Sequence, residues 1–149
     1  MALDVEAEVL IDRPRGEVAA VATDPANDAR WIGGVERARA LGHGPVAPGS
    51  QVERTARFLG RRIDYVTEVV ELEPGALLRM RSVRGPFPMD VTYAFADAGP
   101  GTRAAIRVRG EARGAFRLAG PLLGPIVRRS VAADLRRLKA LVEGHDGDG

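Results

Sequence analysis

The most constraining feature of the sequence is a long segment, from Val35 to about Arg113, in which apolar and polar residues alternate with a period of two. A period of two is typical of strands that bury one face, and short connections join antiparallel neighbours. The segment is therefore predicted to form six antiparallel strands. The turn signals that separate them are at Gly42–Gly49, Gly60, Pro74-Gly75, Gly85-Pro86 and Asp97–Gly101.

A strand and two short helices are predicted before this segment. Residues Leu3–Asp12 also alternate, which indicates a first half-buried strand. The following residues favour a short helix over Arg15–Ala22, because Pro14 stands where a first helical turn tolerates proline. A second short helix, capped by Asp24, is expected to end near Trp31.

A longer helix is predicted at the C-terminal end. Apolar residues recur at helical spacing between Ile126 and Val142, and most of the arginines lie outside that stripe. A chain of 149 residues is too short for two ordinary domains. We therefore expect one domain over residues 1–143, followed by a disordered tail over residues 144–149.

A long antiparallel sheet that is covered by one substantial helix has to curve. Long strands twist and coil, and a helix laid across the concave side can seal the middle of the sheet but not its whole length. The predicted fold is α+β, with a seven-stranded curved antiparallel sheet wrapped round a long C-terminal helix and two short helices after the first strand. A cavity beneath the long helix is expected, and such cavities hold small, mostly apolar ligands.

The alternation also predicts which side chains line that cavity. The face that carries most of the aromatic residues should be concave, and it includes a row of polar exceptions. The opposite face should be charged and solvated, with Arg79, Arg81, Arg103, Arg107 and Arg109 near Glu6, Glu8, Asp64 and Glu68. The expected ligand-binding residues are Trp31, Arg54, Phe58, Tyr65, Thr67, Met80, Ser82, Phe87, Met89 and Tyr93.

Hairpin geometry predicts how these strands pair. A tight turn within Leu59–Arg62 places Arg54 opposite Thr67 on the cavity face. The same turn places Arg57 opposite Asp64 on the solvent face, as a pair of opposite charges. Across the next turn, the register gives Thr67 beside Ser82, Val69 beside Met80, Tyr65 beside Arg84, and Glu71 beside Leu78.

Arg54 is the most informative residue of the predicted cavity wall. Unpaired burial of a charge costs several kcal/mol, so this side chain needs a partner such as Glu71, a ligand oxygen, or solvent at the cavity mouth. In one interpretation, Arg54 orients an oxygen-rich ligand or stabilises an enolate. In the other, it lies at the rim of the sheet or is turned outward by a bulge.

The other candidates have simpler interpretations beside the functional ones. Tyr65 and Tyr93 are each expected to pack in the core with a locally hydrogen-bonded phenol, and a catalytic acid is the alternative. Trp31 most simply plugs one end of the cavity. Met80 and Met89 are typical of adaptable core filling.

Composition excludes several classes of function. The 45% hydrophobic and 28% charged residues are typical of a globular domain, and no apolar run is long enough for an integral membrane segment. The chain has no cysteine, and His43 and His145 lie too far apart to suggest a metal site. Ser50, Ser82 and Ser130 have no histidine within plausible reach for a hydrolytic triad. We therefore expect no metal, no cofactor and a cytoplasmic protein.

The basic residues do not indicate nucleic-acid binding. The formal net charge is only +2, and all basic side chains but Lys139 are arginines spread along the chain. The expected partner is a hydrophobic small molecule, with the chain as a monomer or a homodimer. A protein-interaction role for the convex face remains open through Arg103, Arg107 and Arg109.

Several segments, in this order and spacing, resemble the START-like or SRPBCC superfamily, in its polyketide cyclase/dehydrase and lipid transport branch. The resemblance spans roughly Leu3–Glu143 and implies a helix-grip fold. The segments that carry it are IDRPRGEVAAVATDP, ANDARW, YVTEVVELEPGALLRMRS, GPGTRAAIRV and GPIVRRSVAADLRRLKALVE.

The resemblance implies two functions for the cavity. Members include lipid carriers and hormone-binding proteins, which favours sequestration of a hydrophobic, lipid- or polyketide-like molecule. They also include aromatase/cyclases, in which a cavity arginine and hydroxyl residues steer a poly-β-ketone through aldol closure and water loss. Arg54, Tyr65 and Thr67 are the nearest candidates for those roles. In that alternative, the catalytic residues would be Arg54, which stabilises an enolate, and Tyr65, which transfers a proton.

Overall fold

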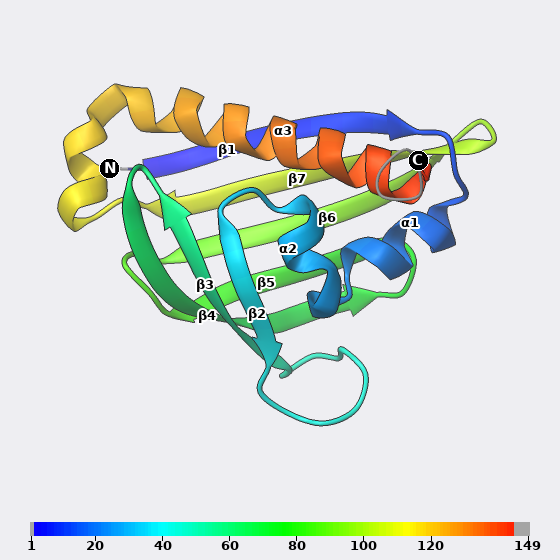
Figure 1. Cartoon of the computed structure of the whole chain (residues 1–149), viewed down its shortest axis with the longest axis horizontal. Coiled ribbons are helices and arrows are strands. Elements are labelled where there is room, and N and C mark those ends of the chain that lie inside the picture. The colour runs from blue at the N-terminus through cyan, green and yellow to red at the C-terminus, as the bar shows by residue number, and fades with distance from the viewer. Residues whose placement is uncertain (1, 145–149) are drawn as a thin grey trace.

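Seven antiparallel strands form one curved sheet, and the helices lie on its concave side (Figure 1). The structure is a computed structural model that describes residues 2–144. The strands lie side by side in the order β1-β7-β6-β5-β4-β3-β2, so the first strand pairs with the last. The elements are β1 (Ala2–Ile11), α1 (Arg15–Ala22), η1 (Pro25–Asn27), α2 (Asp28–Trp31), β2 (Val35–Ala40), β3 (Gln51–Phe58), β4 (Arg61–Glu73), β5 (Leu77–Arg84), β6 (Met89–Ala98), β7 (Gly101–Glu111), η2 (Gly114–Leu122) and α3 (Leu123–Val142).

This architecture confirms the predicted fold. The strands, the two short helices after β1 and the long C-terminal helix all occur in the predicted order, and α1 has the predicted bounds. The residues at 145–149, most of the predicted disordered tail, lie outside the described part of the chain.

The helix α3 covers the sheet with an apolar stripe. Its buried residues recur three and four positions apart, so they share one face of the helix. That face packs most closely on β1 (Figure 1), and the arginines of α3 are exposed. The buried apolar residues of the stripe are Leu123, Val127, Val131, Leu135 and Leu138.

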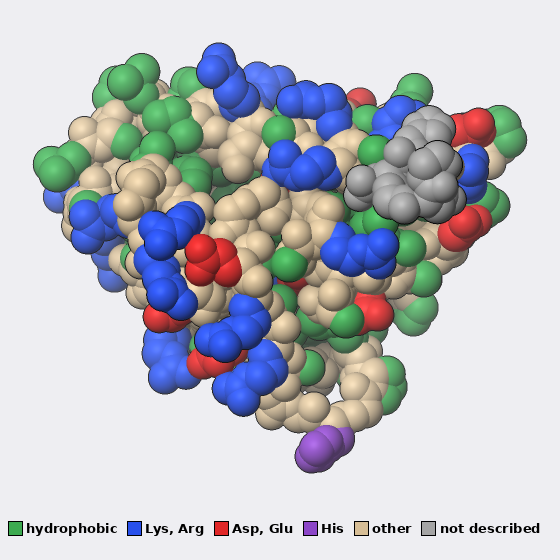
Figure 2. Space-filling model, in the orientation of Figure 1, with side chains coloured by type: hydrophobic (Ala, Val, Ile, Leu, Met, Phe, Trp, Pro, Cys, Tyr) green, Lys and Arg blue, Asp and Glu red, His purple; other side chains and the backbone are tan. Residues whose placement is uncertain are grey.

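The helix η2, between β7 and α3, is an element that the sequence analysis did not predict. Its Phe116 is 3% exposed and lies between Phe58, the last residue of β3, and Phe87 in the β5–β6 connection. The rings of Phe116 and Phe58 stack with centroids 5.7 Å apart, and the ring of Phe87 meets Phe116 edge-on at 5.2 Å. Leu118 and Leu122 of the same element are 88% and 66% exposed. Figure 2 shows hydrophobic side chains gathered at one end of the molecule.

The predicted pairing of β3 with β4 is wrong by two residues. The turn contains only Leu59 and Gly60, so Arg54 lies opposite Tyr65 instead of Thr67. A shift of two residues keeps every side chain on its predicted face, because the side-chain period of a strand is two. Arg54 therefore lies on the predicted, concave face of the sheet despite the error in register.

The shift also changes the charged pair on the solvent face. Arg57 lies opposite Arg62 instead of Asp64. The Nε of Arg57 donates to Glu36 Oε2 at 3.1 Å, across to β2. Asp64 accepts a hydrogen bond from its own partner, Thr55, at 2.8 Å.

The predicted pairing of β4 with β5 is correct at its centre and wrong at both ends. Thr67 lies beside Ser82 and Val69 beside Met80, as predicted. Two irregularities in the ladder then shift the flanking pairs, because each inserts an extra residue on one strand. Arg84 consequently lies opposite Val66 instead of Tyr65, and Leu78 opposite Leu72 instead of Glu71.

The convex face carries opposite charges, although Asp4 and Asp90 were not among the acids expected to pair there. Arg107 donates two hydrogen bonds to Asp4, at 3.0 and 2.8 Å, and Arg79 pairs in the same way with Asp90. Arg103 lies 3.7 Å from Glu8. These side chains are largely exposed, so the pairs contribute little to stability.

Candidate ligand-binding cavity

A cavity of about 180 Å³ lies between the concave face of the sheet and α3. Side chains from all seven strands form one wall, and residues of α2, η2 and α3 close the other, with most of the lining apolar. Nine of the ten predicted ligand-binding residues line it: Trp31, Arg54, Phe58, Tyr65, Thr67, Met80, Phe87, Met89 and Tyr93.

Ser82 is the exception among the ten. Its Oγ accepts a hydrogen bond from the backbone N–H of Met89 at 2.8 Å, where β6 begins. That bond fixes the hydroxyl against the neighbouring strand, and Ser82 is not part of the cavity wall. Its role in the structure is to hold β6 to β5.

Arg54 is buried in the wall and is paired with an acid that the sequence analysis did not single out. The residue is 5% exposed, and its Nε donates to Asp28 Oδ2 at 2.7 Å. Its Nη1 donates to Thr67 Oγ1 at 2.6 Å, and its Nη2 contacts Met80 Sδ at 3.9 Å. Neither a rim position nor a pair with Glu71 describes this side chain.

Asp28 was overlooked because an acid at the start of a short helix usually has a local explanation. Carboxylates favour helix N-termini, and Asp28 is the first residue of α2. A usable signal was present in the spacing. Asp28 lies three residues before Trp31, on the same face of the helix, and a buried tryptophan carries such a neighbour toward the core.

The surroundings shift the protonation equilibria of the buried pair. Burial raises the pKa of Asp28, and this effect outweighs the opposite effect of the neighbouring Arg54 guanidinium. Burial alone would lower the pKa of Arg54, but the charge of Asp28 and the phenols of Tyr93 and Tyr65 more than offset it, so the pKa of Arg54 is raised. Arg54 is therefore permanently charged.

The two phenols lie close to this pair and differ from their prediction. No hydrogen bond joins Tyr65 Oη or Tyr93 Oη to any group within residues 2–144, so the expected local hydrogen bonds are absent there. Burial raises the pKa of Tyr65 and of Tyr93, which keeps both phenols protonated at neutral pH. Each can therefore donate a hydrogen bond to a molecule in the cavity.

Trp31 closes the cavity beside Tyr93. Its ring is 1% exposed and meets the ring of Tyr93 edge-on, with centroids 5.6 Å apart. Trp31 Nε1 is buried without a hydrogen-bond partner among the described residues. Trp31 therefore belongs to the cavity lining, and its role as a plug for one end of the cavity stays a prediction.

Asp134 is a second acid in the wall that the sequence analysis missed. Its side chain is 10% exposed, and its Oδ1 accepts hydrogen bonds from the backbone N–H of Gly33, at 2.8 Å, and from Arg137. Burial raises the pKa of Asp134 to about 6, although the Gly33 amide and Arg137 act in the opposite direction. Asp134 was overlooked because an acid between arginines in a helix looks like part of a solvated face.

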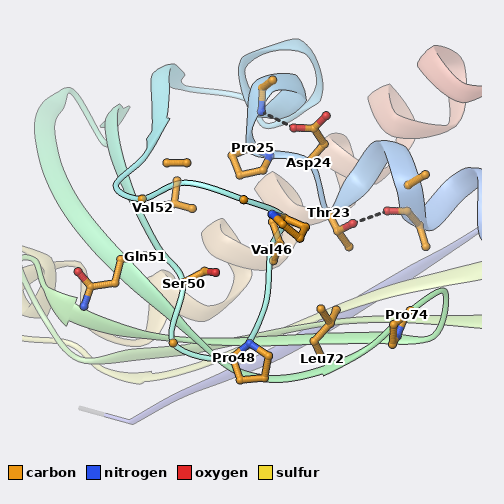
Figure 3. Close-up of a pocket in the computed structure, with 18 of the residues that line it drawn as sticks. Thr23, Asp24, Pro25, Val46, Pro48, Ser50, Gln51, Val52, Leu72 and Pro74 are labelled. Carbon is orange, nitrogen blue, oxygen red and sulfur yellow. Dashed lines mark hydrogen bonds between the residues drawn. The ribbon is translucent and has the colours of Figure 1, made fainter.

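A larger, open groove of about 1310 Å³ lies beside the connection between β2 and β3 (Figure 3). Prolines and small residues from this loop, from the end of α1 and from the β4–β5 turn line it. Its charged side chains, Asp24, Arg39 and Glu73, are all exposed, and Asp24 and Thr23 make local hydrogen bonds with the Ala26 amide and the Ala19 carbonyl. The smaller cavity therefore offers the more specific chemistry.

Two classes of site receive no support from the described residues. Within residues 2–144, no group of three or more acidic or histidine side chains is placed to hold a metal ion. None of the helices in that range has both the length and the apolar character needed to cross a membrane.

The fold and the cavity define a helix-grip protein of the START type. The chain belongs to the family described as polyketide cyclase / dehydrase and lipid transport, whose model matches residues 2–143. The predicted family is thereby confirmed. No curated protein matches the chain in a sequence comparison.

Solved structures share this fold at low sequence identity. The chain is similar to TTHA0849 of Thermus thermophilus, with 21% identity, a TM-score of 0.83, and coverage of 97% of this chain and 99% of that one. It is similar to the Zhui aromatase/cyclase of a Streptomyces species, with 18% identity, a TM-score of 0.79, and coverage of 96% and 94%. It is also similar to a START superfamily protein of Mycobacterium smegmatis, with 16% identity, a TM-score of 0.72, and coverage of 95% of each chain.

Proposed function

We propose that this protein binds a small, mostly apolar molecule that carries a carbonyl or similar oxygen, in the cavity under α3. The observation that carries the proposal is the buried guanidinium of Arg54 in a mostly apolar cavity wall. An apolar side chain there would avoid the cost of desolvating a charge, so stability alone does not favour arginine. A ligand oxygen that accepts a hydrogen bond from Arg54 would explain why a charged side chain is buried in this wall.

The size of the cavity limits the ligand. An apolar cavity of about 150 Å³ holds benzene, and the space here is about 180 Å³. A ligand of one ring, or of one ring with a short substituent, matches this volume. A fused four-ring polyketide is larger than the cavity that the structure contains.

Donors on three residues would hold the oxygen. Arg54 has N–H groups beyond those bonded to Asp28 and Thr67, and the Nη2 group contacts only the sulfur of Met80 within the described residues. The phenols of Tyr65 and Tyr93 are protonated and have no partner among the described residues. Asp28 balances the charge of Arg54, so a neutral ligand is favoured over an anion.

A polyketide cyclase or dehydratase is the second candidate, and the family supports it. In that function, water would take the α-proton of the substrate and Arg54 would stabilise the oxygen of the resulting enolate. Tyr65 would give its proton to the alkoxide that forms with the new carbon–carbon bond, and would regain a proton from the solvent. Catalysis would then require a substrate that is short enough for the cavity. Turnover of such a diketide or triketide, and its loss on substitution of Arg54, would distinguish this function from binding alone.

The test of binding compares two probes of equal size. Acetophenone has a carbonyl and isopropylbenzene does not, so calorimetric titration of both measures the preference for oxygen. We expect the unaltered protein to prefer acetophenone by about tenfold. The double variant Asp28→Asn/Arg54→Met removes both charges together, and it should lose that preference while still binding isopropylbenzene.

A control variant changes an arginine outside the cavity. Arg79→Met removes an exposed guanidinium on the convex face and should leave both affinities unchanged. Binding of neither probe would overturn the proposal, and so would a preference for acetophenone that survives in the double variant. Native mass spectrometry of protein purified from its own host would identify any retained molecule.

A further inference from the structure

The helix α3 presents two polar side chains to the cavity, one turn apart. Ser130 and Asp134 are four positions apart, so they share one face of the helix, and both line the cavity. The other cavity-lining residues of α3 are the apolar Val127 and Val131. The α3 side of the cavity therefore has one polar region, which consists of Ser130 and Asp134.

The two oxygens of Asp134 have different surroundings. Oδ1 accepts a hydrogen bond from the Gly33 amide, which links α3 to the segment after α2, and a second one from Arg137 within α3. Oδ2 accepts no hydrogen bond from residues 2–144, and the Ser130 hydroxyl makes none with them either. A role limited to joining two helices accounts for Oδ1 and leaves Oδ2 unexplained.

Oδ2 is also not sealed inside the protein. Among the described residues, Trp31 Nε1 is the only side-chain nitrogen or oxygen that is fully enclosed and has no hydrogen-bond partner. Oδ2 of Asp134 therefore keeps open surface, although the side chain as a whole is 10% exposed. An acceptor in this position can be reached by a molecule in the cavity.

A carboxylate oxygen that keeps open surface in the cavity lining can accept a hydrogen bond from a donor on the ligand, in place of one from water. Hydrogen bonds to an ionised acceptor are stronger than neutral ones. The sheet side of the cavity offers donors through Arg54 and the two phenols, whereas Asp134 offers an acceptor. The cavity is thus suited to a molecule that carries both an acceptor and a donor.

We propose that Asp134, with Ser130 beside it, forms a second polar subsite that accepts a hydrogen bond from a hydroxyl group of the ligand. The ligand class is then a small hydroxylated aromatic ketone, or the enol of a short diketone, with its carbonyl at Arg54 and its hydroxyl at Asp134. This inference rests on the proposed function, because it assigns the second end of the same ligand.

The experiment compares three ketones that differ only at one position. Acetophenone, 3-hydroxyacetophenone and 3-methoxyacetophenone are titrated calorimetrically near pH 7, where a carboxyl group with a pKa of about 6 is mostly ionised. We expect the unaltered protein to bind the hydroxyl compound about tenfold more tightly than the methoxy compound. The methoxy group has a similar reach but cannot donate.

The variant Asp134→Asn replaces the acceptor Oδ2 by a donor and keeps the oxygen Oδ1 as an acceptor. An asparagine oxygen can still accept from the Gly33 amide, and its NH₂ replaces Oδ2 by a donor. The preference for hydroxyl over methoxy should therefore disappear. Ser130→Ala should weaken that preference without abolishing it, and Asp64→Asn, on the convex side with Thr55, is the matched control that should leave it unchanged.

The outcomes separate this subsite from the proposed function. If none of the ketones binds, the proposed function and the subsite both fail. If they bind with a carbonyl preference that depends on Arg54, but without a hydroxyl preference or with one that Asp134→Asn leaves intact, only the subsite is overturned. An NMR measurement on the unaltered protein needs no variant: nuclear Overhauser contacts should join the ring proton beside the hydroxyl to the methyls of Val131, and their absence would refute the subsite.

Discussion

The guanidinium of Arg54 and the carboxylate of Asp28 meet at 2.7 Å, with side chains that are only 6% and 2% exposed. Arg54 comes from β3 and Asp28 from the first turn of α2, so the pair joins the sheet to the short helices across the cavity wall. Each charge is buried together with its partner. Removal of one partner would leave the other without compensation in an apolar region.

The first prediction follows from this dependence. Asp28→Ala should lower the free energy of unfolding by about 3 to 5 kcal/mol, because Arg54 then stays buried and unpaired. The double variant Asp28→Asn/Arg54→Met removes both charges and should be clearly more stable than Asp28→Ala. Urea unfolding followed by circular dichroism measures both values. Equal losses in the two variants would show that the charge pair is not the cause.

The success of the sequence analysis with the sheet has a simple physical basis. The face on which a strand residue lies depends only on whether its position is odd or even, so Arg54 and Tyr65 were placed in the cavity wall despite a register error of two residues. The two irregularities in the β4–β5 ladder could not be predicted, because a bulge depends on the packing of both strands. Ser82 was wrongly predicted to line the cavity. Its hydroxyl accepts a hydrogen bond from the Met89 backbone N–H, and the alternation of residues does not reveal such a contact.

The helices contain the features that the sequence analysis did not predict. The segment of η2 has Gly114, Gly120 and Pro121, and short helices without a clear period resemble loops. Asp28 and Asp134 are acids in helices, which is typical of a solvated surface. Only the three-dimensional arrangement brings them beside Arg54 and Gly33. The two acids of the site were therefore the part that sequence patterns revealed least, whereas Arg54, Tyr65 and Thr67 were placed correctly.

The second prediction concerns pH and Asp134. Its folded-state pKa of about 6 lies above the ordinary value of 3.8, so the folded protein binds this proton more tightly than the unfolded chain does. The resulting contribution to the free energy of unfolding is fully present below pH 3.8 and is lost as the pH rises through about 6. The difference between these two pKa values corresponds to a free energy of about 3 kcal/mol.

The measurement compares the unaltered protein with Asp134→Asn, which has no carboxyl group at this position. The difference between their free energies of unfolding should change by about 3 kcal/mol between acid and mildly alkaline pH, with the unaltered protein relatively less stable at the higher pH. A difference that stays constant over this range would contradict a raised pKa for Asp134.

The third prediction tests how η2 closes the end of the sheet. Phe116 is 3% exposed and packs between Phe58 and Phe87, so Phe116→Ala should lower the free energy of unfolding by about 3 to 5 kcal/mol. It should also make the backbone of η2 more susceptible to limited proteolysis. Leu118→Ala changes an 88% exposed residue of the same element and should alter stability by less than about 0.5 kcal/mol.

The last prediction separates a structural hydroxyl from the groups of the cavity. Ser82→Ala leaves the Met89 amide without its acceptor, so it should lower the free energy of unfolding by about 1 kcal/mol. Acetophenone binding should be unchanged, because Ser82 does not line the cavity. Thr67→Val is the contrasting variant, since Thr67 lies opposite Ser82 but accepts from Arg54 at 2.6 Å in the wall. Calorimetric titration should show a weaker carbonyl preference for Thr67→Val alone. A similar loss in Ser82→Ala would contradict the prediction and show that Ser82 contributes to binding.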